Sequence, residues 1–232
     1  MSIGKCMQIL VVAPHADDET IGMGGTIARY SADGHEVIVA VLTGHGKDQL
    51  HPLWPAATWD TVRDECREAC KILGASKVIF EEVPAVCVAD EPVWRLNKVT
   101  HGIVESVQPD ILFIPFLNDL HPDHRECFRS FSVAWRPHLP LGKRIKEVYA
   151  YETLSETHLN FPYVEQGFSP NTWVEISAYL ATKIEAMACY RSQIQSHPSA
   201  RSLEAAKALA VWRGSQIGVE AAEAFVLVRR IL

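Results

Sequence analysis

The chain lacks a surplus of basic residues, a paired-cysteine motif and a long apolar run, and each absence excludes a class of protein. Its net charge of −6 argues against nucleic acid or an anionic membrane as the main partner. No apolar stretch is long enough to span a bilayer, so we expect no membrane span. None of the six cysteines forms a Cys-x-x-Cys pair, which favours small apolar packing in a reducing compartment. These features predict a cytoplasmic protein.

The sequence also shows no internal repeat, no low-complexity segment and no linker, so we expect residues 1–232 to form a single domain with one sizeable core. Short β-branched runs alternate with helical patterns. The expected strands cover residues 9–13, 37–42, 77–80, 110–114, 146–151, 172–176 and 222–228. The expected helices cover residues 20–30, 60–73, 91–107, 122–135, 177–190 and 203–213. This alternation predicts an α/β, Rossmann-like fold in which a mostly parallel sheet is sandwiched between helices.

Two further segments are unusual. The first expected helix contains Gly22, Gly24 and Gly25, which weaken a helix by up to about 1 kcal/mol each and indicate a close approach to the sheet or to a ligand. A long loop then covers residues 44–59 and contains Trp54 and Trp59. Two interpretations of these tryptophans stay open: they cover a substrate such as a sugar ring, or they pack back on the body of the protein.

An acidic cluster follows the first expected strand. Residues 14–19 read Pro-His-Ala-Asp-Asp-Glu and lie at a strand-to-helix turn. Adjacent carboxylates repel one another, so they need a cation, a basic partner or full solvation. A solvated turn in which Asp17 or Asp18 caps the next helix is the simpler interpretation. The carboxyl end of a strand in an open α/β sheet, however, is where ligands bind.

A second polar cluster follows the fourth expected strand. Residues 121–124 read His-Pro-Asp-His, and Pro122 suits the first turn of a new helix. In a Rossmann-like strand order, strands one and four lie side by side at the ligand crevice. We therefore expect the two clusters to meet.

Together the clusters have the composition of a catalytic metal site. Such a site needs about three ligands from histidine and carboxylate side chains and an open position for water. The metal lowers the pKa of its bound water to roughly 7 and polarises a carbonyl group. A spare carboxylate can act as general base, and a spare histidine can stabilise an oxyanion. This inventory fits the hydrolysis of an amide or ester.

These residues resemble the PIG-L-like (LmbE-like) zinc-dependent N-deacetylases. The family motif Ala-His-Pro-Asp-Asp-Glu corresponds to residues 14–19, and its His-Pro-Asp-His motif matches residues 121–124 without change. Weaker likeness extends over essentially the whole chain, which we therefore expect to be a single PIG-L/LmbE-like deacetylase domain over residues 1–232. The resemblance implies removal of the acetyl group from an N-acetylated amino sugar or a glycoconjugate of one.

The resemblance also implies roles for individual residues. His15, Asp18 and His124 would bind the metal, which is Zn²⁺ or, with the same ligands, Fe²⁺. Asp17 would be the general base that activates the water and then protonates the leaving amine. His121 would polarise the acetyl carbonyl.

Two further residues receive supporting roles from the resemblance. Asp123 would orient His121, as a carboxylate next to a ring nitrogen does. Arg63 would contact the substrate. The chain departs from the family at Ala16, which replaces the usual proline, and in the loop of residues 44–59, which matches no family pattern.

Other functions share parts of this pattern. An amidase for a non-sugar or thiol-conjugate amide would use the same site. A nucleotide-binding Rossmann protein needs a glycine-rich first turn, but carboxylates occupy that turn here. A non-catalytic sugar-binding protein would be expected to have lost Asp17 or a ligand. The sequence leaves the choice between a monomer and a homo-oligomer open.

Overall fold

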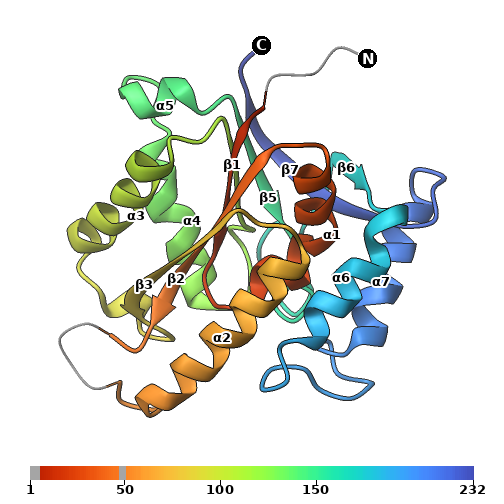
Figure 1. Ribbon diagram of the computed structural model, residues 1–232. Coiled ribbons are helices and arrows are strands. Elements are labelled where there is room, and N and C mark those ends of the chain that lie inside the picture. Colours follow the sequence, from red (N-terminus) through yellow and green to blue (C-terminus); the bar gives the residue numbers. More distant parts are fainter. Residues whose placement is uncertain (1–5, 47–50) are drawn as a thin grey trace.

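The computed structural model describes residues 6–46 and 51–232 (Figure 1). The described chain contains a seven-stranded sheet in the order β3-β2-β1-β4-β5-β7-β6. The strands are β1 (Gln8–Ala13), β2 (Glu36–Gly44), β3 (Lys77–Pro84), β4 (Ile111–Pro115), β5 (Glu147–Tyr151), β6 (Thr172–Glu175) and β7 (Ala222–Arg230). The first five are parallel, whereas β7 runs antiparallel to both β5 and β6. The expectation of a mostly parallel sheet is confirmed.

Helices cover both faces of this sheet. They are α1 (Asp18–Ala32), α2 (Ala56–Ile72), α3 (Val93–Val107), α4 (Pro122–Ala134), α5 (Pro140–Arg144), α6 (Leu180–Ala188) and α7 (Leu203–Ser215). Short 3-10 turns cover Val88–Asp90 and Ser177–Tyr179. Figure 1 shows α1, α2, α6 and α7 on one side and α3, α4 and α5 on the other. The fold is therefore a sheet between two helical layers, as the sequence predicts.

The central strand β1 serves both halves of the core. Ile9 and Val11 point into the cluster under α1, α2 and α6, whereas Leu10 and Val12 point into the cluster under α3 and α4. All four side chains are fully buried. Period-two alternation places successive side chains on opposite faces, so a strand covered on both faces must be apolar throughout.

Helix α1 is broken at Met23, where the backbone leaves the helical region at φ −149° and ψ 27°. Glu223 on β7 accepts hydrogen bonds from the backbone N–H groups of Gly25 and Thr26, at 3.0 and 2.6 Å. Lys183 donates to the carbonyl of Ile21 at 2.9 Å. These side chains satisfy the backbone groups that the break leaves without helical partners. The sequence pattern predicts one continuous helix and misses this break.

The glycines of α1 allow the close approach that the sequence predicts. A Cβ atom on Gly25 would lie 2.6 Å from Cδ1 of Ile176, and one on Gly22 would overlap the ring of Tyr151. Both neighbours are fully buried and cannot move aside easily. The glycines therefore bring α1 against the carboxyl ends of the strands.

Two differences from the sequence expectations concern helices. Helix α2 begins at Ala56 rather than Asp60, because Pro55 occupies the N-cap position and shortens the expected loop. The short helix α5, with Pro140 in its first turn, was not expected. Residues 47–50 of the loop expected over 44–59 lie outside the described residues.

Among the helices that are described, none has the length and apolarity needed to cross a bilayer.

Candidate metal and catalytic site

The two polar clusters meet at the carboxyl ends of β1 and β4. β1 and β4 pair in parallel. The chain continues from β1 to β2 and β3 on one side of β1, and it then crosses to β4 on the other side. Such a reversal of strand order opens a crevice where ligands bind. The ring centroids of His15 and His121 are 4.6 Å apart, and those of His15 and His124 are 5.5 Å apart. Two motifs that are distant in the sequence therefore share one site, as the strand order predicts.

His15, Asp18 and His124 form a group that could hold a metal ion. One ligand atom from each lies within 4.8 Å of the others. Asp18 Oδ2 is 3.4 Å from His15 Nδ1 and 3.2 Å from His124 Nε2. His124 Nε2 is fully buried and has no hydrogen-bond partner among the described residues. A buried polar atom without a partner is costly, so this nitrogen fits a bound cation.

The outer nitrogens of both histidines face carboxylates. His15 Nε2 lies 2.8 Å from Asp123 Oδ2, and His124 Nδ1 lies 2.8 Å from Asp119 Oδ2. A neutral imidazole that donates one N–H to a carboxylate has its other nitrogen free to bind a metal. This arrangement leaves His15 Nδ1 and His124 Nε2 toward Asp18. The donor set therefore fits a tetrahedral metal with two nitrogen ligands and one oxygen ligand.

Asp119 is a member of the site that the sequence analysis did not single out. Its side chain is fully buried between His124 and Thr157, whose hydroxyl donates to Oδ1 at 2.6 Å. Burial raises the pKa of Asp119, and the hydrogen bond from His124 opposes that effect. A carboxylate five residues before a histidine in a loop carries no periodic signal, so only the folded chain shows the pairing.

Asp123 lies against a different histidine from the one expected. Its carboxylate accepts from His15 and from the backbone N–H groups of Val86 and Val88, at 2.7 and 3.3 Å. Its contact with His121 is through its backbone N–H, which donates to His121 Nδ1 at 3.1 Å. His121 occupies the N-cap position of α4, so the helix end itself orients the ring.

Asp17 has an unusual backbone and a side chain that few groups contact. It precedes α1 with φ 127°, a value that non-glycine residues rarely adopt. Neither carboxylate oxygen has a hydrogen-bond partner among the described residues, although Arg201 Nη1 lies 3.4 Å from Oδ2. The strained turn thus directs the carboxylate into the site instead of onto the helix end, and no capping hydrogen bond forms.

The third acid of the cluster, Glu19, points into the core. It accepts from the hydroxyls of Thr20 and Tyr190 and from the backbone N–H of Asp17, the last at 3.2 Å. Cys66 and Cys70 lie close enough to form a further group with Glu19. Because its oxygens already have donors, we interpret Glu19 as an anchor for the turn and the cysteines as core packing.

Burial and neighbouring charges shift the pKa values of the site in opposite directions. Burial, followed by the charge of Asp18, raises the pKa of Asp17 to about 8. Burial and the nearby His15 lower the pKa of His121 to about 4. Burial alone would lower the pKa of His15, but hydrogen bonds to Asp123 and Asp18 outweigh it and raise that pKa to about 9. Such divergent values are typical of functional sites.

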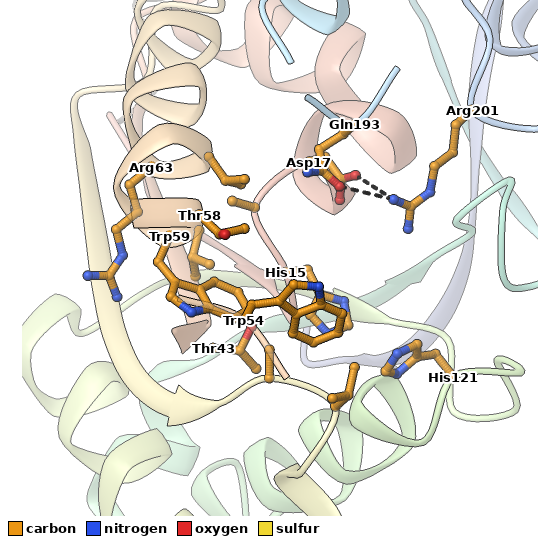
Figure 2. A pocket seen from close by; sticks show the side chains of 15 residues that line it. His15, Asp17, Thr43, Trp54, Thr58, Trp59, Arg63, His121, Gln193 and Arg201 are labelled. Carbon is orange, nitrogen blue, oxygen red and sulfur yellow. Dashed lines mark hydrogen bonds and ion pairs between the residues drawn. The ribbon is translucent and has the colours of Figure 1, made fainter. Parts of the chain in front are cut away.

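A cavity of about 340 Å³ opens beside these residues. Its volume is at the lower end of the range for small-molecule sites. It is lined by His15, Ala16, Asp17, Val41, Thr43, Trp54, Thr58, Trp59, Val62, Arg63, Ala85, Val86, His121, Gln193 and Arg201. Figure 2 shows Asp17 beside Arg201, and Trp54 beside Trp59.

The two arginines of the cavity are placed differently. Arg63, the expected substrate contact, donates to Glu82 at 2.7 Å and to the carbonyl of Glu81 at 2.9 Å. In Figure 2 its guanidinium points away from Asp17 and His121. Arg201, which the sequence analysis did not single out, points toward Asp17. Its segment, between α6 and α7, has no periodic pattern, so no sequence signal indicates this position.

Comparison with known proteins agrees with the geometry. Over 199 residues the chain is 29% identical to the diacetylchitobiose deacetylase of Thermococcus kodakarensis, a match that covers 80% of this chain and 70% of that protein. It is 24% identical to the 1D-myo-inositol 2-acetamido-2-deoxy-alpha-D-glucopyranoside deacetylase of Actinosynnema mirum, covering 84% of this chain and 83% of that one. The solved structure of the conserved protein TT1542 from Thermus thermophilus superposes with a TM-score of 0.72 and 28% identity, over 97% of this chain and 96% of the other.

The family assignment follows from a match that includes both motifs. The sequence model of the PIG-L family, described as GlcNAc-PI de-N-acetylase, matches residues 10–135. This segment holds more than half of the chain, both polar clusters, most of β1 and all of β4, the two strands that bring the clusters together. The chain therefore belongs to the PIG-L family.

Proposed function

We propose that this protein is a zinc-dependent N-deacetylase that removes the acetyl group from an N-acetylated amino sugar or a glycoconjugate of one. The observation that carries this proposal is the carboxylate of Asp17, buried without a hydrogen-bond partner among the described residues and beside three candidate metal ligands. The names of the relatives, which act on N-acetylated sugars, support this class of substrate.

His15, Asp18 and His124 would hold the metal. When bound there, Zn²⁺ supplies a Lewis acid and lowers the pKa of a coordinated water to roughly 7. Fe²⁺ suits the same two histidines and one carboxylate. A positive charge at this point would also lower the pKa of Asp17 from about 8, so that Asp17 would be ionised at neutral pH.

Asp17 then moves the protons of the reaction. As an ionised carboxylate it takes a proton from the attacking water, and it passes that proton to the amine nitrogen when the C–N bond breaks. Its carboxylate lines the cavity and makes no hydrogen bond to the described residues that would compete with these transfers. Arg201 adds a positive charge 3.4 Å away and helps keep the base ionised.

His121 supplies a hydrogen bond to the substrate carbonyl. Its pKa of about 4 keeps the ring neutral, and Nδ1 already accepts from the backbone N–H of Asp123. The single ring proton must therefore reside on Nε2, which is free to donate to the oxygen as negative charge develops there. Asp123 and the start of α4 fix the orientation of this donor.

Six cysteines without a disulfide fit a reducing compartment and support a cytoplasmic location.

The test is metal content coupled to acetate release from N-acetylated sugars, before and after chelation and after reloading with Zn²⁺ or Fe²⁺. We expect about one metal per chain, acetate release that a chelator abolishes, and loss of the metal in His124→Ala. A metal-loaded protein that releases no acetate from any sugar, yet hydrolyses a thiol-conjugate amide, would replace the substrate class. Full metal occupancy in His124→Ala would contradict the ligand set.

A further inference from the structure

Trp54 and Trp59 form an aromatic wall of the cavity, and the ring of His51 packs against both of them. The indole of Trp54 lies across from that of Trp59 in an edge-to-face arrangement, with ring centroids 6.0 Å apart. The ring of His51 contacts both indoles, with centroid distances of 5.2 Å to each. Trp54 and Trp59 line the cavity, and Trp54 keeps 40% of its surface exposed. An exposed indole next to a catalytic carboxylate is an available contact surface.

His51 fixes the backbone that carries Trp54. Its Nδ1 accepts from the backbone N–H groups of Leu53 and Trp54, at 3.1 and 3.3 Å. Its Nε2 donates to the carbonyl of Ala85 at 2.9 Å, and Ala85 itself lines the cavity. The His51 side chain is buried, so these bonds form away from solvent. The wall is thus ordered before a ligand arrives, which lowers the entropy cost of binding.

The other residues of the cavity limit which part of a substrate can contact Trp54 and Trp59. Asp17 and His121 must receive the acetamide group, so the group on the amide nitrogen extends along the cavity toward the tryptophans (Figure 2). Thr43, Thr58 and Gln193 also line the cavity and give it polar side chains. A pyranose ring has an apolar C–H face and a hydroxyl-bearing edge, and it matches an aromatic wall with polar neighbours better than a wholly apolar group does.

We propose that Trp54 and Trp59 form the ring-binding subsite of this enzyme, in which the C–H face of the N-acetylated pyranose stacks on Trp54. This inference rests on the proposed N-deacetylase function and adds the residues that select a cyclic sugar over an open-chain acetamide. Arg63 is paired with Glu82 and points away from the reacting groups, so the aromatic wall, not this arginine, provides the main contact with the ring.

The experiment compares a cyclic substrate with its open-chain counterpart. N-acetylglucosamine has the pyranose, and N-acetylglucosaminitol has the same acetamide on an open chain, in which the ring oxygen has become a hydroxyl. In the metal-loaded protein, Trp54→Leu should raise KM for N-acetylglucosamine by about tenfold, the effect of losing one aromatic contact, with little change in kcat. Trp54→Phe should retain most of the affinity. KM for the open-chain compound should be nearly the same in all variants.

Trp94→Leu is the matched control, because Trp94 is 66% exposed on α3 and does not line the cavity. Metal content and circular dichroism check that each variant folds. An unchanged KM for N-acetylglucosamine in Trp54→Leu, or an equal rise for the open-chain compound, would overturn the stacking subsite while acetate release still supports the deacetylase.

A binding measurement separates this inference from the failure of the proposed function. Titration of the metal-loaded protein with N-acetylglucosamine should give a saturable change in tryptophan fluorescence, lost in Trp54→Leu and kept in Trp94→Leu. If no acetate is released but this signal appears, the function is wrong and the sugar subsite stands. If acetate is released and the fluorescence of the wild-type and Trp54→Leu proteins responds equally, the subsite is wrong and the function stands.

Discussion

Asp119 Oδ2 lies 2.8 Å from His124 Nδ1, and both side chains are completely buried. The hydrogen bond fixes which nitrogen of His124 faces Asp18, and therefore which nitrogen is available to a metal. The Thr157 hydroxyl donates to the other oxygen of Asp119 and holds the carboxylate in place. A residue that would touch neither metal nor substrate thus sets the orientation of a proposed ligand.

Removing this support should weaken metal binding. We expect Asp119→Ala to lower the affinity for Zn²⁺ by about 10- to 100-fold, because His124 loses the carboxylate that orients it. Asp119→Asn keeps an acceptor oxygen and should cost less. Competition with a chromophoric chelator measures both affinities. Equal affinities in wild type and Asp119→Ala would show that His124 does not bind the metal through Nε2.

Asp17→Asn should separate chemistry from metal binding. The amide keeps the size of the side chain but cannot accept and return a proton, so kcat should fall by at least about 100-fold. Metal content should stay at the wild-type value, because Asp17 is not among the three proposed ligands. Asp64→Asn, at an exposed position of α2, is the control. Activity retained in Asp17→Asn would contradict its role as the base.

Metal binding should depend on pH through the two histidines. Burial opposes protonation of His124, but the charge of Asp18 and the contact with Asp119 outweigh it and raise its pKa well above the usual value. The pKa of His15 is raised to about 9 for similar reasons. A metal binds neutral imidazole, so its binding at pH 7 must release protons, and the apparent affinity should increase as the pH rises toward about 9.

Calorimetry at pH 7 in two buffers with different ionisation enthalpies measures the total proton release, to which Asp17, with its pKa of about 8, also contributes. A binding enthalpy independent of the buffer would mean that neither histidine is protonated in the metal-free protein. Circular dichroism over the same pH range checks that the chain remains folded.

Glu223→Gln should lower the free energy of unfolding by about 3 kcal/mol, because Lys183 would remain as an unpaired buried charge. In the native chain Lys183 Nζ lies 2.5 Å from Glu223 Oε1, and both side chains are almost fully buried. Urea denaturation measures the change. Asp64→Asn breaks an exposed ion pair with Arg67 and should cost less than about 1 kcal/mol. Similar losses in the two variants would show that the buried pair contributes no special stability.

The sequence predicts the sheet well because its signals are local. The run Ile9–Val12 is apolar throughout, as a strand covered on both faces must be, and the adjacency of β1 and β4 follows from the strand order of the fold class. The same adjacency brings His15 and His124 together. A motif placed at a strand end is therefore located in space once the strand order is known.

The remaining features depend on contacts between distant segments. Arg201 reaches Asp17 from the segment before α7, and Asp119 reaches His124 in α4 from the loop before that helix, so neither has a periodic pattern. The break at Met23 follows from hydrogen bonds supplied by Glu223, whose own sequence environment indicates nothing but a strand. Tertiary contacts override local propensity at these positions.

The hydrogen bonds from the backbone of Gly25 and Thr26 to Glu223 join α1 to the last strand of the sheet, which is synthesised late. Glu223 is 198 residues beyond Gly25, yet it holds the segment that follows Asp17 and Asp18. A nascent chain in which both polar clusters have left the ribosome, but β7 has not, has every proposed ligand and lacks this support. Contacts between such distant residues form late in folding, because the intervening chain must be closed into a loop. Tight binding at the proposed ligands is therefore expected only after β7 has joined the sheet.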